Sequence, residues 1–136
     1  MGNEQNLAVV NQIYAAFGRG DLPGMLALLD SDVSWVTPGP SDLPTGGRRT
    51  GHAEVMEFFG TLVGLMDIVR FTPEELFANG DKVVVLGDEE ARVKATGETV
   101  RNRWVHVFTL RDGRVVAFEE IFDAVPLMAA LRGASV

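Results

Sequence analysis

The stretch RWVHVFTLRDGRVVAFEEIFD, residues 103–123, decides how the chain folds. Two largely apolar runs flank Asp112-Gly113, and this pattern predicts a β-hairpin. The connecting loop has either two residues, Asp112 and Gly113, or three, in which case it begins at Arg111. Because side chains alternate along a strand, a shift of one residue would move every side chain of one strand to the opposite face.

The aromatic residues favour the three-residue loop. In that register Leu110 pairs with Arg114. Stepping back along both strands places His106 opposite Phe118, whereas a two-residue loop would divide the aromatic residues between both faces. One face of the hairpin then carries a mainly aromatic set: Trp104, His106, Phe108, Val116, Phe118, Glu120 and Phe122.

A preceding hairpin points to the same face. The residues TGET at 96–99 fit a two-residue turn with glycine at its first central position, and this turn places Glu89 opposite His106. Three strands would therefore bring Glu89, His106 and Glu120 together. Since burying a carboxylate is costly unless it is paired or functional, the cluster indicates a chemical role.

Length and composition exclude several classes of protein. A chain of 136 residues fits one domain, 1–136, that buries about two-thirds of its unfolded surface. It has no cysteine, so disulfides and thiolate metal sites are excluded. The net charge of −7 argues against nucleic acid and anionic membranes as partners. The two histidines and scattered carboxylates have no metal-ligand spacing, and no cofactor motif is present, so we expect neither metal nor cofactor.

The N-terminal residues show no targeting pattern. Residues 1–16 lack a basic start and a cleavage site. No apolar run approaches the roughly 18 residues needed to cross a bilayer. We therefore expect a soluble, cytoplasmic protein.

Periodicity along the chain predicts helices first and strands later. Apolar residues at helical spacing indicate helices over 4–18 and 52–63, the second stripe being Val55, Met56, Phe59 and Val63. Between them Asp21 is expected to cap a short helix with Pro23 in its first turn. Residues 37–51 contain three prolines and four glycines and predict a surface loop. Strands are expected at 33–36, 68–78, 82–95, 99–110 and 114–122, with a last helical turn at 126–131.

This order of elements predicts an α+β fold. Three N-terminal helices would pack on a curved, mostly antiparallel sheet that encloses a pocket. The pocket is where the aromatic face and the three ionisable residues would meet.

Three segments carry a resemblance to a known family: GDLPGMLALLDSDVSWV at 20–36, TGHAEVMEFF at 50–59 and VHVFTLRDGRVVAFEEIFD at 105–123. Together they resemble the cone-shaped nuclear transport factor two superfamily and, within it, the SnoaL-like branch. Relatives of that branch include polyketide cyclases, ketosteroid isomerases and limonene-epoxide hydrolases. The resemblance covers nearly the whole chain and implies the fold more than the reaction, since this scaffold hosts enzymes, transport factors and ligand binders.

The resemblance also implies roles for individual residues. The acid/base carboxylate of the polyketide cyclases, an aspartate there, falls on Glu120, and a pocket histidine falls on His106. The two catalytic aspartates of the epoxide hydrolases fall on Glu89 and Glu120, but the arginine that bridges them falls on Gly87. The base of the steroid isomerases falls near Thr37, whose hydroxyl cannot abstract a proton at neutral pH.

We therefore expect cofactor-independent acid/base catalysis, a cyclisation or isomerisation, on a small hydrophobic carbonyl or polyketide-like compound. Glu120 would move the proton, His106 would set its charge state, and Glu89 is a third catalytic candidate. Each has a structural alternative: a solvated edge carboxylate for Glu120, a satisfied buried imidazole for His106 and a solvated face for Glu89. Ligand contacts are expected from aromatic side chains: Tyr14, Trp35, Trp104, Phe108, Phe118 and Phe122.

Other functions stay open at this point. The same pocket would suit a binding module without turnover or an epoxide hydrolase-like enzyme. A dimerisation domain is a further possibility, because the outward face of the hairpin is apolar and predicts a homodimer formed through the sheet. The residues expected on that face are Val105, Val107, Val115, Ala117 and Ile121.

Overall fold

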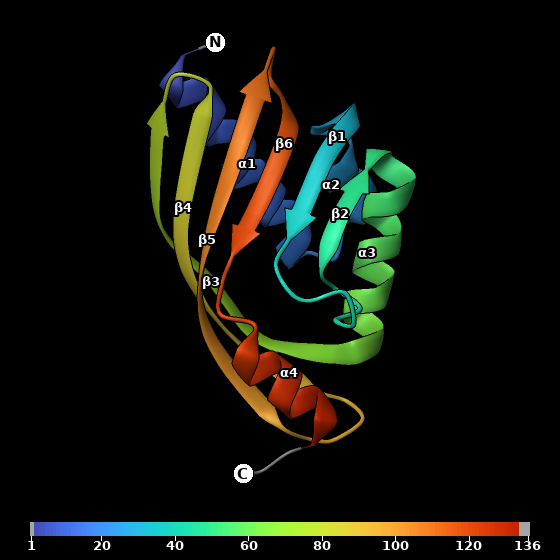
Figure 1. Ribbon diagram of the computed structural model, residues 1–136. Coiled ribbons are helices and arrows are strands. Elements are labelled where there is room, and N and C mark those ends of the chain that lie inside the picture. The colour runs from blue at the N-terminus through green and yellow to red at the C-terminus, as the bar shows by residue number, and fades with distance from the viewer. Residues whose placement is uncertain (1, 134–136) are drawn as a thin grey trace.

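A computed structural model describes residues 2–133 of the chain as helices around a curved six-stranded sheet (Figure 1). The helices are α1 (Asn3–Gly18), α2 (Leu22–Leu26), α3 (Gly51–Leu65) and α4 (Val125–Arg132). The strands are β1 (Leu29–Thr37), β2 (Gly47–Thr50), β3 (Met66–Asn79), β4 (Lys82–Val93), β5 (Thr99–Arg111) and β6 (Arg114–Ile121).

The strand order in the sheet is β2-β1-β6-β5-β4-β3, and every neighbouring pair is antiparallel except β1 with β6. The long strands β3, β4 and β5 bend around the helices, with α1 behind the sheet, α3 along its β1–β2 end and α4 beside the connection between β4 and β5 (Figure 1). The expected α+β class with a curved, mostly antiparallel sheet is therefore confirmed.

The helices form where the sequence predicts them. In α2 the side chain of Asp21 accepts a hydrogen bond from the Gly24 amide at 2.9 Å, which satisfies a donor that the first helical turn leaves free. The buried side of α3 differs by one position from the expected stripe. Phe58 and Phe59 are buried, whereas Met56 and Val63 are 41% and 57% exposed.

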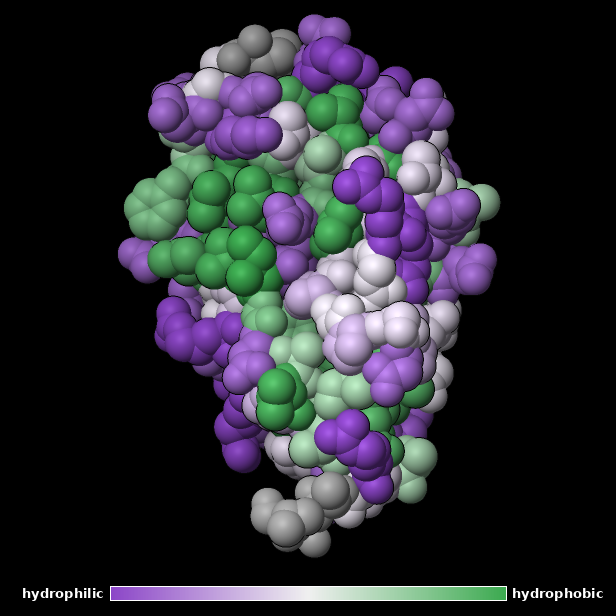
Figure 2. Space-filling model, viewed as in Figure 1, coloured by the Kyte–Doolittle hydropathy of each residue, from purple (hydrophilic) through white to green (hydrophobic). Residues whose placement is uncertain are grey.

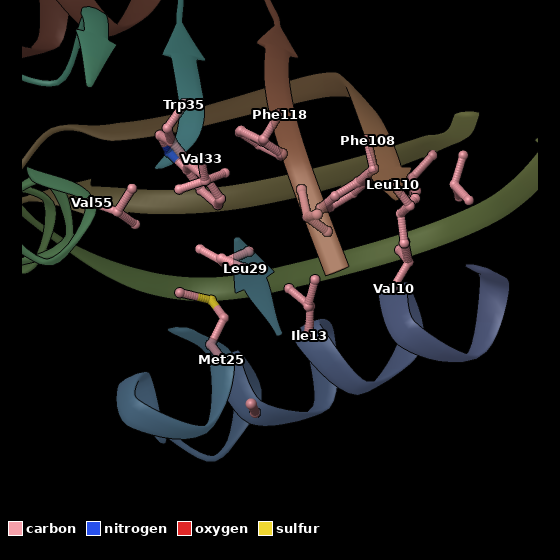
Figure 3. Packing of buried hydrophobic residues seen from close by; sticks show 14 of the residues in the cluster. Val10, Ile13, Met25, Leu29, Val33, Trp35, Val55, Phe108, Leu110 and Phe118 are labelled. Carbon is pink, nitrogen blue, oxygen red and sulfur yellow. The ribbon is translucent and has the colours of Figure 1, made fainter. Parts of the chain in front are cut away.

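The core lies between α1, α2 and the concave face of the sheet. Val10 and Ile13 of α1 and Met25 of α2 point toward the sheet (Figure 3), and they belong to one buried cluster with Phe108 of β5 and Phe118 of β6. Each of these side chains is at least nine-tenths buried. Burial of a side chain of this size contributes about 1.5–3 kcal/mol, so this contact holds α1 against the sheet.

The connection between β5 and β6 corrects the predicted register. The turn has two residues, Asp112 and Gly113, with φ angles of 53° and 81°, and Arg111 pairs with Arg114. A two-residue turn with both φ angles positive matches the right-handed twist of the strands, and Asp-Gly is among the sequences that tolerate it. The three-residue loop was therefore wrong.

A β-bulge preserves the predicted aromatic face despite the different turn. Leu110 pairs with Val115, but Thr109 pairs with Ala117, so one extra residue lies in β6 between these pairs. Beyond the bulge His106 lies directly opposite Glu120. Val115, expected on the outward face, is instead fully buried, and Val116 does not take the inward place assigned to it.

The connection between β4 and β5 also corrects a prediction. Arg92 pairs with Thr99, and residues 94–98, between the end of β4 and the start of β5, form a longer connection than the expected two-residue turn. Glu89 consequently lies opposite Asn102, and Val85 lies opposite His106. The difference is four residues, an even number, and Glu89 therefore remains on the concave face.

Residues 37–51 are also more ordered than expected. Residues 47–50 form β2, which pairs with β1 at the edge of the sheet. Strand β1 in turn inserts beside β6 and brings Trp35 opposite Phe118. The predicted surface loop is therefore limited to residues 38–46.

Candidate functional site

A cavity opens inside the curved sheet and encloses about 790 Å³ between protein atoms, with its open mouth included. Most of its wall is apolar, and the polar side chains gather in two places. The lining residues are Ile13, Tyr14, Phe17, Met25, Trp35, Thr37, Thr45, Phe58, Phe59, Leu62, Met66, Ile68, Phe71, Glu89, His106, Phe108, Phe118, Glu120, Phe122 and Leu127.

The first polar group in the cavity is a chain of hydrogen bonds through His106. The Tyr14 hydroxyl oxygen lies 2.7 Å from His106 Nδ1, and His106 Nε2 lies 2.9 Å from Glu120 Oε2. The imidazole is 5% exposed, so both of its nitrogens depend on these protein partners. Side chains from α1, β5 and β6 thus form one connected unit.

The chemistry of the three groups assigns the protons. Burial, and then the charge of Glu120, raises the pKa of Tyr14, so its hydroxyl remains protonated. A carboxylate oxygen of Glu120 accepts a hydrogen bond, so His106 Nε2 carries the hydrogen. In neutral His106 the other nitrogen, Nδ1, then accepts the hydroxyl hydrogen of Tyr14.

Trp104 packs against the imidazole ring of His106. Its ring stacks on His106 with centroids 3.9 Å apart and on Phe71 at 4.7 Å. It does not line the cavity, which corrects its expected place among the ligand-contacting residues. The ring lies directly over Gly87, where a Cβ atom would approach it to 2.1 Å. Any side chain at Gly87 would therefore force a shift of the Trp104 ring, which stacks on His106.

Glu89 is the second carboxylate of the cavity. Its burial, followed by the negative charges of Glu120 and Asp88, raises its pKa from 4.5 to about 7. Glu89 therefore exchanges its proton near neutral pH, where a general acid or base is most effective. The sequence placed Glu89 in an acidic run typical of a solvated face, but its register opposite Asn102 keeps it on the concave face, where it lines the cavity.

The second polar group lies at the loop between β1 and β2. The Thr37 hydroxyl donates a hydrogen bond to the carbonyl oxygen of Thr45, and both threonines line the cavity. Arg49 binds the loop from outside by donating to the carbonyl oxygens of Pro44 at 2.9 Å and Gly46 at 3.2 Å. Its guanidinium carbon lies 4.9 Å from the centre of the Phe58 ring. Arg49 therefore shapes the loop rather than the cavity interior.

The structure brings most of the predicted residues together. Glu89, His106 and Glu120 line one cavity, as do the aromatic residues Tyr14, Trp35, Phe108, Phe118 and Phe122. The rings of Trp35 and Phe118 stack with centroids 3.9 Å apart. Sequence reasoning missed part of the wall, namely Phe17, Thr45, Phe58 and Phe71. Helical spacing on the buried side of α3 could have identified Phe58, but nothing local marks Thr45 or Phe71.

Two further features bear on the class of site. Within residues 2–133 no group of three or more His, Asp or Glu side chains is arranged to hold a metal ion. In the same part of the chain no helix is both long and apolar enough to cross a membrane.

Comparison with known proteins extends these observations. The chain is 26% identical over 123 residues to uncharacterised proteins of Mycobacterium tuberculosis and Mycobacterium bovis, covering 90% of this chain and 92% of each relative. A nuclear transport factor two-like protein from Burkholderia xenovorans LB400 has a TM-score of 0.88 and 33% identity over 96% of this chain and 98% of that one. TerC, crystallised with polyporic acid, has a TM-score of 0.86 and 33% identity over 94% and 98% of the two chains.

The part of the chain that matches a known protein family contains most of the polar residues of the cavity. Residues 10–118 match the family described as SnoaL-like domain. This range contains Tyr14, Glu89 and His106, and it ends two residues before Glu120. The chain therefore belongs to the SnoaL-like domain family and has the nuclear transport factor two-like fold.

Proposed function

We propose that this protein catalyses cofactor-independent proton transfer on a small hydrophobic carbonyl compound, in an isomerisation or a cyclisation. One observation carries the proposal: two carboxyl groups line the same apolar cavity in different environments. Glu120 accepts a hydrogen bond from His106, whereas burial raises the pKa of Glu89 to about 7. Two carboxyl groups in such different environments are suited to act as base and acid.

The proposed reaction begins with Glu120 as the base. Its carboxylate removes a proton from the carbon next to the carbonyl, while His106 holds the carboxylate in place. Glu89 in its protonated form donates to the carbonyl oxygen, so the C–H bond breaks as the enol forms. Return of the Glu120 proton to another carbon of a conjugated enol, while the enol hydroxyl returns its proton to Glu89, completes an isomerisation. In a cyclisation the enol carbon instead attacks a second carbonyl carbon; the enol hydroxyl returns its proton to Glu89, and the oxygen of the second carbonyl takes the proton from Glu120. The proton first taken by Glu120 is released in the second half of the cycle.

The comparisons support a hydrophobic ligand of this kind. TerC, one of the similar solved structures, was crystallised with polyporic acid, which is an aryl-substituted hydroxyquinone and so combines carbonyl groups with apolar rings. The cavity of the present chain has aromatic walls and carboxyl groups that complement both features.

The experiment uses hydrogen exchange on a probe ketone, so that the natural substrate is not needed. Wild type and Glu120→Gln are incubated with 2-tetralone in deuterated buffer, and NMR follows exchange at the carbon next to the carbonyl. Glu120→Gln keeps the shape of the side chain but removes the base, so we expect exchange to slow by about 10²–10⁴-fold with little change in ligand affinity. The neighbouring exposed residue supplies the control Glu119→Gln. Equal exchange by wild type and Glu120→Gln would remove Glu120 from the mechanism.

The alternatives differ in their expected results. A binding module without turnover would bind the ketone but leave its exchange at the uncatalysed rate in every variant. An epoxide hydrolase-like reaction is disfavoured because the arginine that such enzymes place between their two carboxylates corresponds to Gly87. The Trp104 ring fills the space that a side chain at that position would need. A cytoplasmic location stays a prediction from the sequence.

We also propose that the protein acts as a homodimer formed through the convex face of the sheet. Hydrophobic side chains gather over β3, β4 and β5 on that face (Figure 2). Phe77 and Ile121 are 55% and 50% exposed there, with partly exposed Val84, Leu86, Val105 and Val107 between them. A second copy that places the same patch against this one would bury both by two-fold symmetry.

A further inference from the structure

The charged side chains that line the cavity are acidic. Of the described residues that line it, Glu89 and Glu120 are acidic, and none is a lysine or an arginine. A ligand inside the cavity thus meets two carboxyl groups and no permanent positive charge. The chain as a whole has a net charge of −7, which adds to the same potential at the mouth.

Two arginines, Arg49 and Arg70, are already bound to other groups of the protein. Arg49 donates to the carbonyl oxygens of the 38–46 loop, and Arg70 forms an ion pair with Asp88 at 2.6 Å. His106 is the one residue of the cavity wall with a ring that can become cationic. Both of its nitrogens already have partners, Tyr14 and Glu120, and a proton gained there would be neutralised by Glu120.

The aromatic wall acts in the same direction. The faces of aromatic rings carry partial negative charge, so they attract cations and repel anions. Seven phenylalanines, one tyrosine and one tryptophan line the cavity together with the two carboxyl groups: Phe17, Phe58, Phe59, Phe71, Phe108, Phe118, Phe122, Tyr14 and Trp35. Among its described residues the wall has no lysine or arginine that could offset the desolvation of an anionic ligand.

We propose that the cavity selects ligands by charge: it accepts a neutral carbonyl compound or a protonated amine and rejects the carboxylate of the same skeleton. The proposal rests on the proposed function only in taking this cavity as the ligand site. The natural ligand then buries a part that has no ionised acid, such as a ketone, an aldehyde, a lactone or an amine. A ligand with an acidic hydroxyl enters in its neutral form.

The size of the effect follows from Coulomb's law. Two like unit charges about 6 Å apart, at the effective dielectric constant of about 20 found in proteins, repel strongly enough to weaken binding about 100-fold. Two carboxylates in the cavity would exceed this factor when both are ionised. We therefore expect at least a 100-fold preference for a neutral ligand over the matching carboxylate.

The preference for neutral over anionic ligands can be measured with three probes that share one ring system and differ in charge. Isothermal titration calorimetry at pH 7.5 determines the affinity of the wild type for 2-acetonaphthone, 2-naphthylmethylamine and 2-naphthoate. We expect the amine to bind at least as tightly as the ketone and the naphthoate to bind at least 100-fold more weakly. This comparison needs no variant, so it does not depend on whether a substituted protein folds.

Variants then assign the selectivity to the two carboxyl groups. In Glu120→Gln the affinity gap between ketone and naphthoate should narrow by about 100-fold, the factor expected for one carboxylate, and in the double variant with Glu89→Gln the rest of the gap should close. Glu119→Gln, outside the cavity, should keep the full gap. Circular dichroism verifies that each variant is folded.

The outcomes separate this inference from the proposed function. Naphthoate binding as tightly as the ketone would overturn charge selection while leaving the cavity as the ligand site. Failure of all three probes to bind would overturn both proposals. The third outcome is the full difference in affinity between ketone and naphthoate, together with equal hydrogen exchange on the ketone by wild type and Glu120→Gln. It would support charge selection and refute only the proposed catalysis.

Discussion

Replacing Glu89 with glutamine should make the protein more stable, and the gain should appear only as the pH rises. The cavity raises the pKa of Glu89 from 4.5 to about 7, so the folded protein holds a proton that the unfolded chain has already released. Stability from this group is full below pH 4.5 and is lost as the pH rises through 7. Glutamine imitates the protonated carboxyl group and does not titrate.

The expected difference in stability follows from the raised pKa of Glu89. A difference of 2.5 pKa units between folded and unfolded states corresponds to at most about 3 kcal/mol of folding free energy. Glu89→Gln and wild type should therefore unfold with nearly equal free energies below about pH 4.5. Glu89→Gln should be more stable by up to about 3 kcal/mol at pH 8, less the part that solvent screens at this partly buried side chain.

Urea denaturation at half-unit intervals from pH 4.5 to pH 8, at one protein concentration, measures the difference. The control is Glu57→Gln, an exposed position of α3, which should show no such trend. In a Glu120→Gln background the gap should shrink but persist, because burial is the first cause of the shift and the charge of Glu120 the second. A difference between Glu89→Gln and wild type that is the same at pH 5 and pH 8 would refute the reasoning.

Two further predictions test the support of the site and the assembly. Gly87→Ala should destabilise the protein by about 1–3 kcal/mol in thermal or urea unfolding, because its Cβ would lie 2.1 Å from the Trp104 ring, whereas Gly60→Ala, with open space on α3, should be neutral or stabilising. Equal stability of the two would contradict the close packing of Trp104. Val107→Glu should dissociate the proposed dimer in light scattering at micromolar concentration, and a monomeric wild type would refute the dimer itself.

Much of the fold is determined by short-range patterns. The helical spacing of Val10 and Ile13 places α1, and Asp21 with Pro23 marks the start of α2. These features depend on residues within one or two turns of each other, so a single sequence displays them directly. The alternation along residues 103–123 likewise identifies an aromatic face that includes His106 and Glu120.

The register of the strands, by contrast, is not determined by short-range patterns. Asp112 and Gly113 allow either loop, and local preference for the two-residue turn is opposed by the need to keep the aromatic residues on one face. The protein satisfies both by inserting the bulge in β6, a solution that depends on the packing of Phe108 and Phe118 against α1. A bulge has no signature in the sequence of the strand itself.

What the sequence determined by itself is the set of elements apart from β2, both acidic residues of the cavity and five of its aromatic residues, because periodicity and turn chemistry act between near neighbours. What only the tertiary structure decided is the environment of those residues. The hydrogen bond from Tyr14 to His106 joins positions 92 residues apart, and the raised pKa of Glu89 requires burial beside Glu120. Such contacts form only when the curved sheet closes around the helices, since distance and desolvation, rather than residue type, set the strength of an electrostatic interaction.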